Sequence, residues 1–263
     1  MARNFLQILI DKFPVFTIEN RLLFAAYVGS SAHNTYVPSS DPNSIDDIDL
    51  FAVVVPPKRF IYGLQNFEHW TLREGDLDFT VFSLQKYVRL LAFKSNPNML
   101  CTLWLRDEDY LYKDKSFDGF LSLRGAFNQR DLIYKAFGGY AHDQLKRMTH
   151  QAYEGYMGEK RKTLVDKFGY DCKNAAHCIR LLLMGIGFFN TCRLQVWQPD
   201  DKARMLRSIK KGEWPTANIL QRAEQLKLEL DLAYKNTEMS KTPPIKLIEN
   251  LLIDTIDHYN DSR

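Results

Sequence analysis

The chain has 263 residues, of which 45% are hydrophobic, and this length and composition suit one large or two small globular domains. The formal net charge of +3 is too small to prove a nucleic-acid partner, but it does not exclude one, because the clustering of charge matters more than its sum. We expect a soluble, cytoplasmic protein, because no apolar run approaches the roughly 20 residues of a membrane span, no signal peptide is visible and the four cysteines form no CxxC pair.

The first part of the chain alternates short helices with apolar strands. The run from Phe51 to Val55 is β-branched and apolar, which is typical of a buried strand. Ser83 precedes a helical pattern and is expected to cap that helix. In chain order we expect a helix over Arg3–Phe13, a strand over Arg21–Val28, a mobile loop over Ser31–Ser44, a strand over Asp47–Val55, an antiparallel pair of strands over Glu68–Leu72 and Leu77–Phe82, a helix over Leu84–Lys94 and another from Asn96 through Leu105.

The second part of the chain is expected to be helical. After a charged connector over Asp107–Ser116, apolar residues recur from Asn128 onward at spacings of three and four. The expected helices are Asp131–Arg147, Ala152–Asp166, Asp171–Thr191, Asp200–Lys210, Thr216–Asn236 and Ile245–Asn260. We therefore expect an α+β protein, with a mixed sheet and flanking helices in an N-terminal domain over residues 1–122 and an all-helical C-terminal domain over residues 123–263.

Two carboxylates stand at the start of the second expected strand. Side chains on a strand alternate between its faces, so Asp47 and Asp49 point the same way. Neighbouring carboxylates repel unless a positive charge lies between them, and Mg²⁺ or Mn²⁺ is the natural partner, because hard cations prefer oxygen ligands. Asp46 directly precedes this pair and leaves the register open, although the i, i+2 spacing favours Asp47 and Asp49 as catalytic metal ligands.

Such residues suit phosphoryl or nucleotidyl transfer, which needs positioning, neutralised phosphate charge and an activated hydroxyl. Two metal ions about 3.5–4 Å apart can clamp the attacking and leaving oxygens, and three carboxylates usually hold such a pair. Asp78 is the candidate for the third metal ligand or general base, with Asp76 as the alternative. Gly29 lets a phosphate approach the backbone closely, and Ser30 offers it a hydroxyl and an N–H.

Gly29-Ser30, a loop and Asp47-x-Asp49 entering an apolar strand resemble the signature of the DNA polymerase β-like nucleotidyltransferase superfamily. Asn34 stands in this loop where relatives usually carry glycine, and asparagine tolerates the left-handed conformation that such a turn needs. Four further blocks are similar to the predicted nucleotidyltransferases linked to bacterial and phage RNA repair: Lys94-Ser95-Asn96-Pro97-Asn98, Gly139-Tyr140-Ala141, Tyr170-Asp171-x-Lys173-x-x-x-His177-x-x-Arg180 and Gly212-Glu213-Trp214. The resemblance covers roughly residues 28–247 and implies a polymerase β-like N-terminal domain followed by a substrate-binding helical domain.

A second group of candidate residues lies on the expected helix Asp171–Thr191. Lys173, His177 and Arg180 fall at i, i+4 and i+7, so they share one face of this helix. Taken alone, the pattern also fits a solvated basic edge with His177 bonded to a neighbour. The resemblance favours a functional role, in which Lys173 and Arg180 bind the phosphates of a nucleoside triphosphate or of the acceptor and His177 orients one of them.

The leading hypothesis is a metal-dependent enzyme that transfers a nucleoside monophosphate from a nucleoside triphosphate to an acceptor hydroxyl and releases pyrophosphate. The resemblance implies an RNA 3′ end, such as that of a tRNA, as the acceptor. Nucleotidylation of a protein or small molecule is the alternative within the same class. A non-catalytic nucleotide- or RNA-binding regulatory module and a metal nuclease are the other classes, although a nuclease leaves the Gly29-Ser30 turn unexplained.

Overall fold

The computed structural model describes residues 4–149 and 158–261. The strands are β1 (Leu22–Tyr27), β2 (Ile48–Val54), β3 (His69–Glu74), β4 (Leu77–Ser83) and β5 (Tyr110–Lys113). The helices are α1 (Phe5–Lys12), α2 (Gly29–Ala32), α3 (Lys58–Ile61), α4 (Leu84–Lys94), α5 (Pro97–Thr102), α6 (Asp118–Ser122), α7 (Arg130–Thr149), α8 (Glu159–Phe168), α9 (Cys172–Thr191), α10 (Asp200–Lys210), α11 (Thr216–Asn236) and α12 (Ile245–Asp261). Short 3₁₀ turns cover Glu19–Arg21, Asp107–Asp109, Lys115–Phe117 and Arg124–Phe127. The expected α+β class is confirmed, and the start of the helix expected from Ala152 lies outside the described residues.

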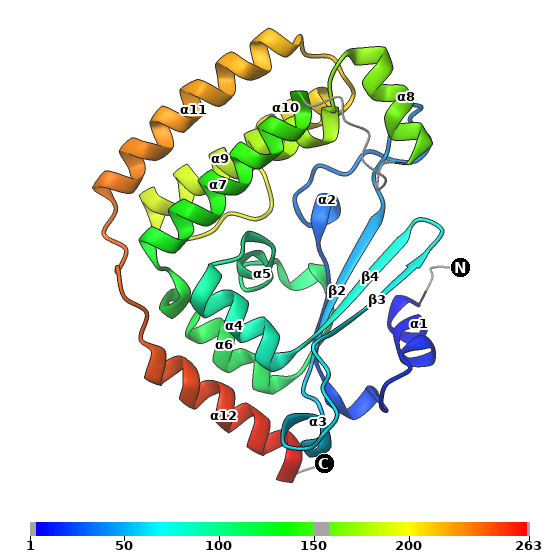
Figure 1. Ribbon diagram of the computed structural model, residues 1–263, viewed down its shortest axis with the longest axis vertical. Coiled ribbons are helices and arrows are strands. Elements are labelled where there is room, and N and C mark those ends of the chain that lie inside the picture. Colours follow the sequence, from blue (N-terminus) through cyan, green and yellow to red (C-terminus); the bar gives the residue numbers. More distant parts are fainter. Residues whose placement is uncertain (1–3, 150–157, 262–263) are drawn as a thin grey trace. The chain divides into compact units, whose positions relative to one another are not determined.

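The strands form one mixed sheet in the order β3-β4-β2-β1-β5 (Figure 1). β2 and β4 are parallel, and the other neighbouring pairs are antiparallel. The expected antiparallel pair is confirmed as β3 and β4, which are joined around Gly75 in a left-handed conformation with φ of +62°. β2 is buried along most of its length, because its unbroken apolar run lies in the middle of the sheet and is covered on both faces.

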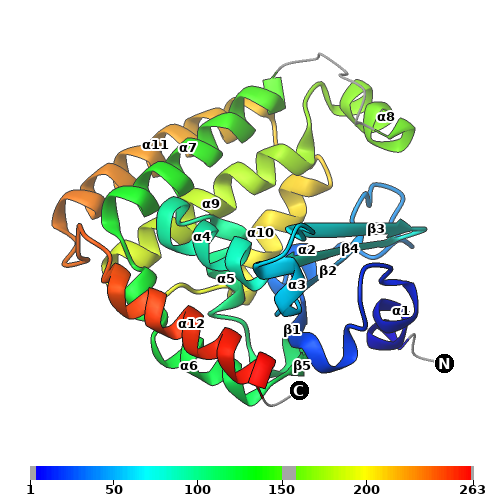
Figure 2. The same ribbon diagram turned by 60° about the horizontal axis from the view of Figure 1, so that its bottom comes forward.

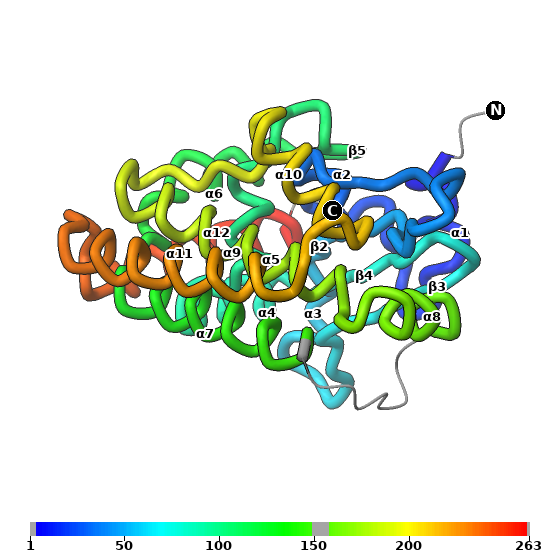
Figure 3. The backbone as a smooth tube through the Cα atoms, turned by 90° about the horizontal axis from the view of Figure 1, so that it is seen from above, coloured from blue at the N-terminus to red at the C-terminus, as the bar shows by residue number. Residues whose placement is uncertain are grey.

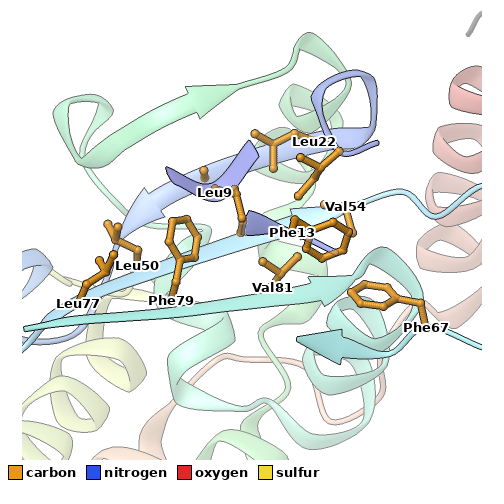
Figure 4. Packing of buried hydrophobic residues seen from close by; sticks show 12 residues of the cluster. Leu9, Phe13, Leu22, Leu50, Val54, Phe67, Leu77, Phe79 and Val81 are labelled. Carbon is orange, nitrogen blue, oxygen red and sulfur yellow. The ribbon is translucent and has the colours of Figure 1, made fainter. Parts of the chain in front are cut away.

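One face of the sheet packs against α1 to form a hydrophobic core (Figure 4). Leu50 from β2 and Phe79 from β4 project into this core and meet Leu9 and Phe13 from the N-terminal segment. Each of these four side chains is buried, and full burial of one Leu or Phe side chain stabilises a fold by about 1.5–3 kcal/mol. Since successive strand residues alternate in direction, the residues that precede Leu50 and Phe79 project from the opposite face.

The opposite face of the sheet is covered by α4 and aromatic side chains. Tyr87 of α4 is fully buried and contacts Phe24 and Phe51, with ring centroids 5.7 Å and 6.3 Å apart. α12 runs beside α4 in this part of the chain (Figure 2). Its Tyr259 hydroxyl donates a hydrogen bond of 3.0 Å to the carbonyl of Leu22, so the last helix is anchored to the sheet.

The chain divides into two compact units, and the limits of these units differ from the expected domain boundary between residues 122 and 123. The sheet unit comprises the residues up to Ala32, Asp47–Asn128 and the residues from Thr242. The helical unit comprises His33–Asp46 and the described residues of Gln129–Lys241. Two segments therefore belong to the other unit than expected. The last helix joins the sheet because α12 packs on α4, and residues 33–46 join the helices through the contacts described below.

In the helical unit, α9 is the central element. It runs alongside both α7 and α11 and also packs against α10 and α8 (Figure 3). Gly185 permits this close packing, since a Cβ added there would lie 2.9 Å from Cδ1 of Leu230 and 3.3 Å from Cβ of Phe137. Asp171 caps the helix by accepting a hydrogen bond of 3.1 Å from the backbone N–H of Asn174.

Two short elements differ from the expectations. Residues 110–113, expected within a charged connector, form β5 and pair with the edge of β1. Gly29 and Ser30, expected as a turn, begin the single helical turn α2. In both cases the segment is too short to carry a periodic signal of its own. No helix among the described residues combines the length and the apolarity that a membrane crossing requires.

Candidate active site

Two of the three expected carboxylates lie side by side in the sheet. β2 and β4 are parallel in a register that pairs Asp49 with Asp78. Paired residues of adjacent strands point to the same face, and such strands lie about 4.8 Å apart. Both side chains are half-buried on the face opposite the α1 core. The expectation that Asp78 lies beside the Asp47-x-Asp49 strand therefore agrees with the sheet register, whereas Asp76 offers its backbone carbonyl to the N–H of Ile48.

The Gly29 backbone packs directly against the Asp49 side chain. Gly29 adopts a left-handed conformation with φ of +59°. A Cβ added at this position would overlap Oδ2 of Asp49 and lie 2.7 Å from its Cγ. The neighbouring N–H of Val28 donates a hydrogen bond of 2.9 Å to the carbonyl of Asp49. Glycine is thus required here for two independent reasons, and Ser30 follows it at the start of α2.

The donor chemistry of Asp49 and Asp78 fits a divalent cation, because two in-register carboxylates provide oxygen ligands on one face. The third expected ligand, Asp47, is half-buried and immediately precedes β2. Among the described residues, no group of three or more His, Cys, Asp or Glu side chains is gathered closely enough to hold a metal ion. Asp49 and Asp78 are therefore in register, and the role of Asp47, Asp49 and Asp78 as metal ligands stays a prediction.

Asp78 also has a basic partner that the sequence analysis did not single out. Its Oδ2 atom lies 3.1 Å from Nη2 of Arg73, the residue directly opposite on β3. The Arg73 side chain is 73% exposed, so this ion pair is formed in contact with solvent and is weak. Arg73 is consequently available to exchange Asp78 for another anion.

Asp46, whose role the sequence left open, is a structural residue. Its side chain is 1% exposed, and Oδ2 lies 2.8 Å from Nζ of Lys210. The same Asp46 oxygen accepts a hydrogen bond of 2.9 Å from the backbone N–H of Val37. Because these contacts occupy the Asp46 carboxylate inside the helical unit, the register that favours Asp47 and Asp49 is supported.

Residues 33–46, most of which lie in the expected mobile loop Ser31–Ser44, are held at many points by the helices of their own unit. Lys210 donates to the carbonyl of Thr35 over 2.9 Å, and Lys211 forms an ion pair of 2.8 Å with Asp41. Arg207 donates to the carbonyl of Asn34. Asn34 has φ of +58°, which agrees with the left-handed turn that the sequence predicts at this position. Hydrogen bonds and an ion pair therefore fix this segment to the helices of its own unit.

Lys173, His177 and Arg180 share a face of α9, as expected from their spacing, and all three are half-buried. Lys173 donates a hydrogen bond of 3.2 Å to the carbonyl of Ile45. Nε2 of His177 is buried and has no hydrogen-bond partner among the described residues, and the His177 ring packs edge-on against Tyr140. Arg180 donates to Nε2 of His33 and contacts Sδ of Met184 over 3.5 Å.

The two histidines of this region are held neutral. Burial lowers the pKa of His177 well below its usual value, and the nearby positive charges of Arg180, Lys210 and Lys173 lower it further. Burial, followed by Arg180, likewise lowers the pKa of His33 well below its usual value. Nδ1 of His33 lies 3.0 Å from the carbonyl of Val196, which can only accept, so Nδ1 carries the proton and Nε2 accepts from Arg180.

Lys210 and the partnership between His33 and Arg180 are the features of this unit that sequence reasoning missed. Lys210 lies at the end of α10, 164 positions after its partner Asp46, and no local pattern marks such a pair. His33 lay in the expected site loop, but its contact with Arg180 joins residues 147 positions apart. The expected residues divide between the units, with Gly29, Ser30, Asp47, Asp49 and Asp78 in the sheet unit and Lys173, His177 and Arg180 in the helical unit.

Comparison with known proteins gives a family match and similar solved structures. A family model described as the RNA repair pathway DNA polymerase beta family matches residues 5–191. Among solved structures, the chain is similar to a nucleotidyltransferase-like protein from Exiguobacterium sibiricum 255-15, with 11% identity, a TM-score of 0.28 and coverage of 91% of this chain and 72% of that chain. Backbones that differ this much support no transfer of detail from one protein to the other. No curated protein matches the chain.

Proposed function

The chain belongs to the RNA repair pathway DNA polymerase beta family, and from this premise we propose that it is a metal-dependent nucleotidyltransferase. It transfers a nucleoside monophosphate from a nucleoside triphosphate to an acceptor hydroxyl and releases pyrophosphate. The observation that supports this proposal most is the in-register pair of Asp49 and Asp78 beside the Cβ-free backbone of Gly29. Two carboxylates that were merely exposed on a surface would not require a glycine packed against one of them.

The residues of the chain have separate roles in this reaction. Asp49 and Asp78, with Asp47 immediately before β2, are the ligands for Mg²⁺ or Mn²⁺. When bound, these ions neutralise phosphate charge and lower the pKa of the acceptor hydroxyl. Gly29 leaves room for a phosphate near the backbone, and Ser30 provides it with a hydroxyl and an N–H donor. Asp78 accepts the proton of the acceptor hydroxyl or orients that hydroxyl.

The second set of residues supplies positive charge for phosphate binding. Lys173 and Arg180 are the anion donors, and His177 orients a phosphate from the same face of α9. The family association with RNA repair makes an RNA 3′ end, including that of a tRNA, our first choice of acceptor. Nucleotidylation of a protein or small molecule is the second candidate.

The test uses the purified full-length chain with labelled nucleoside triphosphates, Mg²⁺ and total RNA. We expect label in RNA and release of pyrophosphate, both abolished by Asp49→Asn with the fold retained. The matched control is Asp107→Asn, which changes a side chain that is 91% exposed and forms an ion pair with the surface residue Lys113. Label in protein alone would overturn the choice of RNA. If no acceptor gives pyrophosphate release, the enzymatic proposal fails and a non-catalytic binding module replaces it.

A further inference from the structure

The sheet unit contains a small cavity that the candidate active site does not use. It lies where β4 passes into α4, beside α3 and the residues that precede β3, and its volume is about 110 Å³. Its lining residue Ser83 follows Asp78 by five positions on β4, so the cavity lies about 17 Å along the strand from the carboxylate pair. A group bound here therefore does not touch the proposed metal ligands. All the lining residues belong to the sheet unit.

The apolar wall of the cavity is formed by aromatic rings that other rings hold in place. Phe60 and Phe67 line the cavity. The Phe67 ring packs edge-on against the rings of Phe13 and Phe16, with centroids 5.5 Å and 5.4 Å apart. Phe16 also contacts Phe60, at a centroid distance of 5.2 Å. This wall is thus formed before a ligand arrives, and aromatic side chains of this kind bind planar groups such as nucleobases.

The polar wall offers hydrogen-bonding groups that have no partner. Oε1 of Gln85 is buried and has no hydrogen-bond partner among the described residues. A buried acceptor in this state is costly, and a ligand N–H group that donates to it removes the cost. The side chain of Asn66 is exposed at the cavity and makes no hydrogen bond within the described part of the chain. Both amides present a donor and an acceptor, which is the chemistry that reads the edge of a base.

Two cations line the cavity from α4. Lys86 and Arg89 fall at i and i+3, so they share a face of this helix. Nζ of Lys86 lies 3.1 Å from Nδ1 of His69 and 3.8 Å from Oε2 of Glu68, and this ion pair is weak because Glu68 is 52% exposed. Arg89 is exposed and forms no ion pair with the residues that the structure describes. Two positive charges less the one negative charge of Glu68 leave an excess of one.

We propose that this cavity binds one pyrimidine nucleotide, with its base against the aromatic and amide side chains and its phosphate on Lys86 and Arg89. An N–H group of the base donates to Oε1 of Gln85. The size favours a pyrimidine, because a cavity of about 150 Å³ holds a single six-membered ring and this cavity is smaller. The single negative charge of a phosphodiester matches the excess of one positive charge. The inference goes beyond the proposed function and does not depend on it.

A free mononucleotide and a nucleotide within a single-stranded RNA share this chemistry. Two exposed apolar side chains, Tyr62 and Leu64, lie in the turn between the lining residues Ile61 and Asn66. An exposed tyrosine ring beside a bound base provides a surface on which the adjacent base of a strand stacks. The contribution of Tyr62 therefore distinguishes the two sources.

The experiment titrates the full-length chain by calorimetry with cytidine, uridine and adenosine monophosphates in EDTA, so that neither a metal ion nor transfer is involved. We expect both pyrimidine nucleotides to bind, and adenosine monophosphate to bind at least about fivefold more weakly, because its larger base overfills the cavity. Gln85→Leu and Arg89→Gln should each weaken pyrimidine binding by about fivefold or more. Lys115→Gln is the matched control, because Lys115 is exposed in the same unit and does not line the cavity.

Thermal unfolding gives a second readout. Gln85→Leu replaces a buried acceptor without a partner by an apolar group, so its Tm should not fall although its affinity for the nucleotide does. A glutamine with a merely structural role would instead give a lower Tm and unchanged binding. A short oligocytidylate that binds more tightly than the mononucleotide, with the gain lost in Tyr62→Ala, identifies an RNA strand as the source, and equal binding identifies the free nucleotide.

Three results would overturn the proposal: no pyrimidine binding by the wild type, equal binding of adenosine monophosphate, or a response of Gln85→Leu that matches that of Lys115→Gln. The cavity would then hold only water. None of these results bears on nucleotidyl transfer, which Asp49→Asn tests separately.

Discussion

Replacing Gly29 by alanine should remove cation binding at the carboxylate pair while leaving the sheet folded. The left-handed backbone at Gly29, with φ of +59°, costs a side-chain-bearing residue about 1–2 kcal/mol. The added methyl group would also overlap Oδ2 of Asp49 and approach its Cγ to 2.7 Å. The carboxylate of Asp49 must therefore move away from its position opposite Asp78.

The chain provides a control that separates these two effects. Gly169 also has a left-handed backbone, with φ of +77°, but no heavy atom of the described residues lies within 4 Å of a Cβ added there. Gly169→Ala should therefore show only the backbone cost, and about 1–2 kcal/mol corresponds to a fall in Tm of about 2–8 °C for a domain of this size. Gly29→Ala should lower Tm further, because it adds the overlap with Asp49.

Binding of Mn²⁺, measured by electron paramagnetic resonance, gives the decisive comparison. We expect Gly169→Ala to bind Mn²⁺ as the wild type does and Gly29→Ala to lose binding. Nucleotidyl transfer by Gly29→Ala should fall by about a hundredfold, the effect of misplacing a catalytic group by about 1 Å. Should Gly29→Ala retain wild-type Mn²⁺ affinity and match Gly169→Ala in Tm, the packing of Gly29 against a metal-binding carboxylate would have no functional meaning.

Two further predictions concern ion pairs. Arg73→Gln should tighten Mn²⁺ binding by about 1.5- to 5-fold, because Mn²⁺ no longer competes with the exposed Arg73–Asp78 ion pair, which is worth about 0.2–1 kcal/mol. Weaker Mn²⁺ binding by this variant would mean that Arg73 supports the site. Asp46→Ala should lower the free energy of unfolding, measured in urea, by about 3–5 kcal/mol, because it leaves Lys210 buried without its partner. The double variant Asp46→Ala with Lys210→Met should lower the free energy of unfolding by less than Asp46→Ala alone. Burial lowers the pKa of Lys210 to about 8 from 10.5. Between pH 8 and pH 10.5 the unfolded chain therefore binds more protons than the folded chain. The free energy of unfolding of the wild type should rise with pH in this range, relative to that of Lys210→Met. A flat pH response of this difference, or additive losses in the double variant, would contradict these expectations.

Elements with a local signal could be predicted from the sequence. The strand β4 alternates buried and half-buried residues along its whole length, as the pattern of residues 77–82 predicts. Ser83 caps α4 by accepting from the N–H of Lys86 over 3.2 Å, in agreement with the sequence analysis. Asn96 caps α5 ahead of Pro97, close to the expected start of that helix. Each of these features depends on residues that lie within a few positions of one another.

Elements that depend on distant partners could not be predicted. β5 has four residues and exists because β1 offers it an edge, 84 or more positions earlier in the chain. The assignment of α12 to the sheet depends on contacts such as the hydrogen bond between Tyr259 and Leu22, which are 237 positions apart. The periodicity of α12 predicts a helix but does not specify which surface covers its apolar face.

The candidate site depends both on local sequence signals and on contacts with distant residues, as Asp46 and Asp47 illustrate. Locally they are two identical acidic side chains at the entrance to one strand, and spacing alone only favours the second. The structure distinguishes the two residues, because the ammonium group of Lys210 contacts the buried Asp46 carboxylate from a position that no local pattern connects to it. The role of Asp47 as a metal ligand stays a prediction. Residue 46 therefore belongs to the helical unit, while residue 47 belongs to the sheet unit and immediately precedes β2. A variant that breaks the Asp46 pair should consequently disturb cation binding by the neighbouring Asp47 even though it changes no metal ligand.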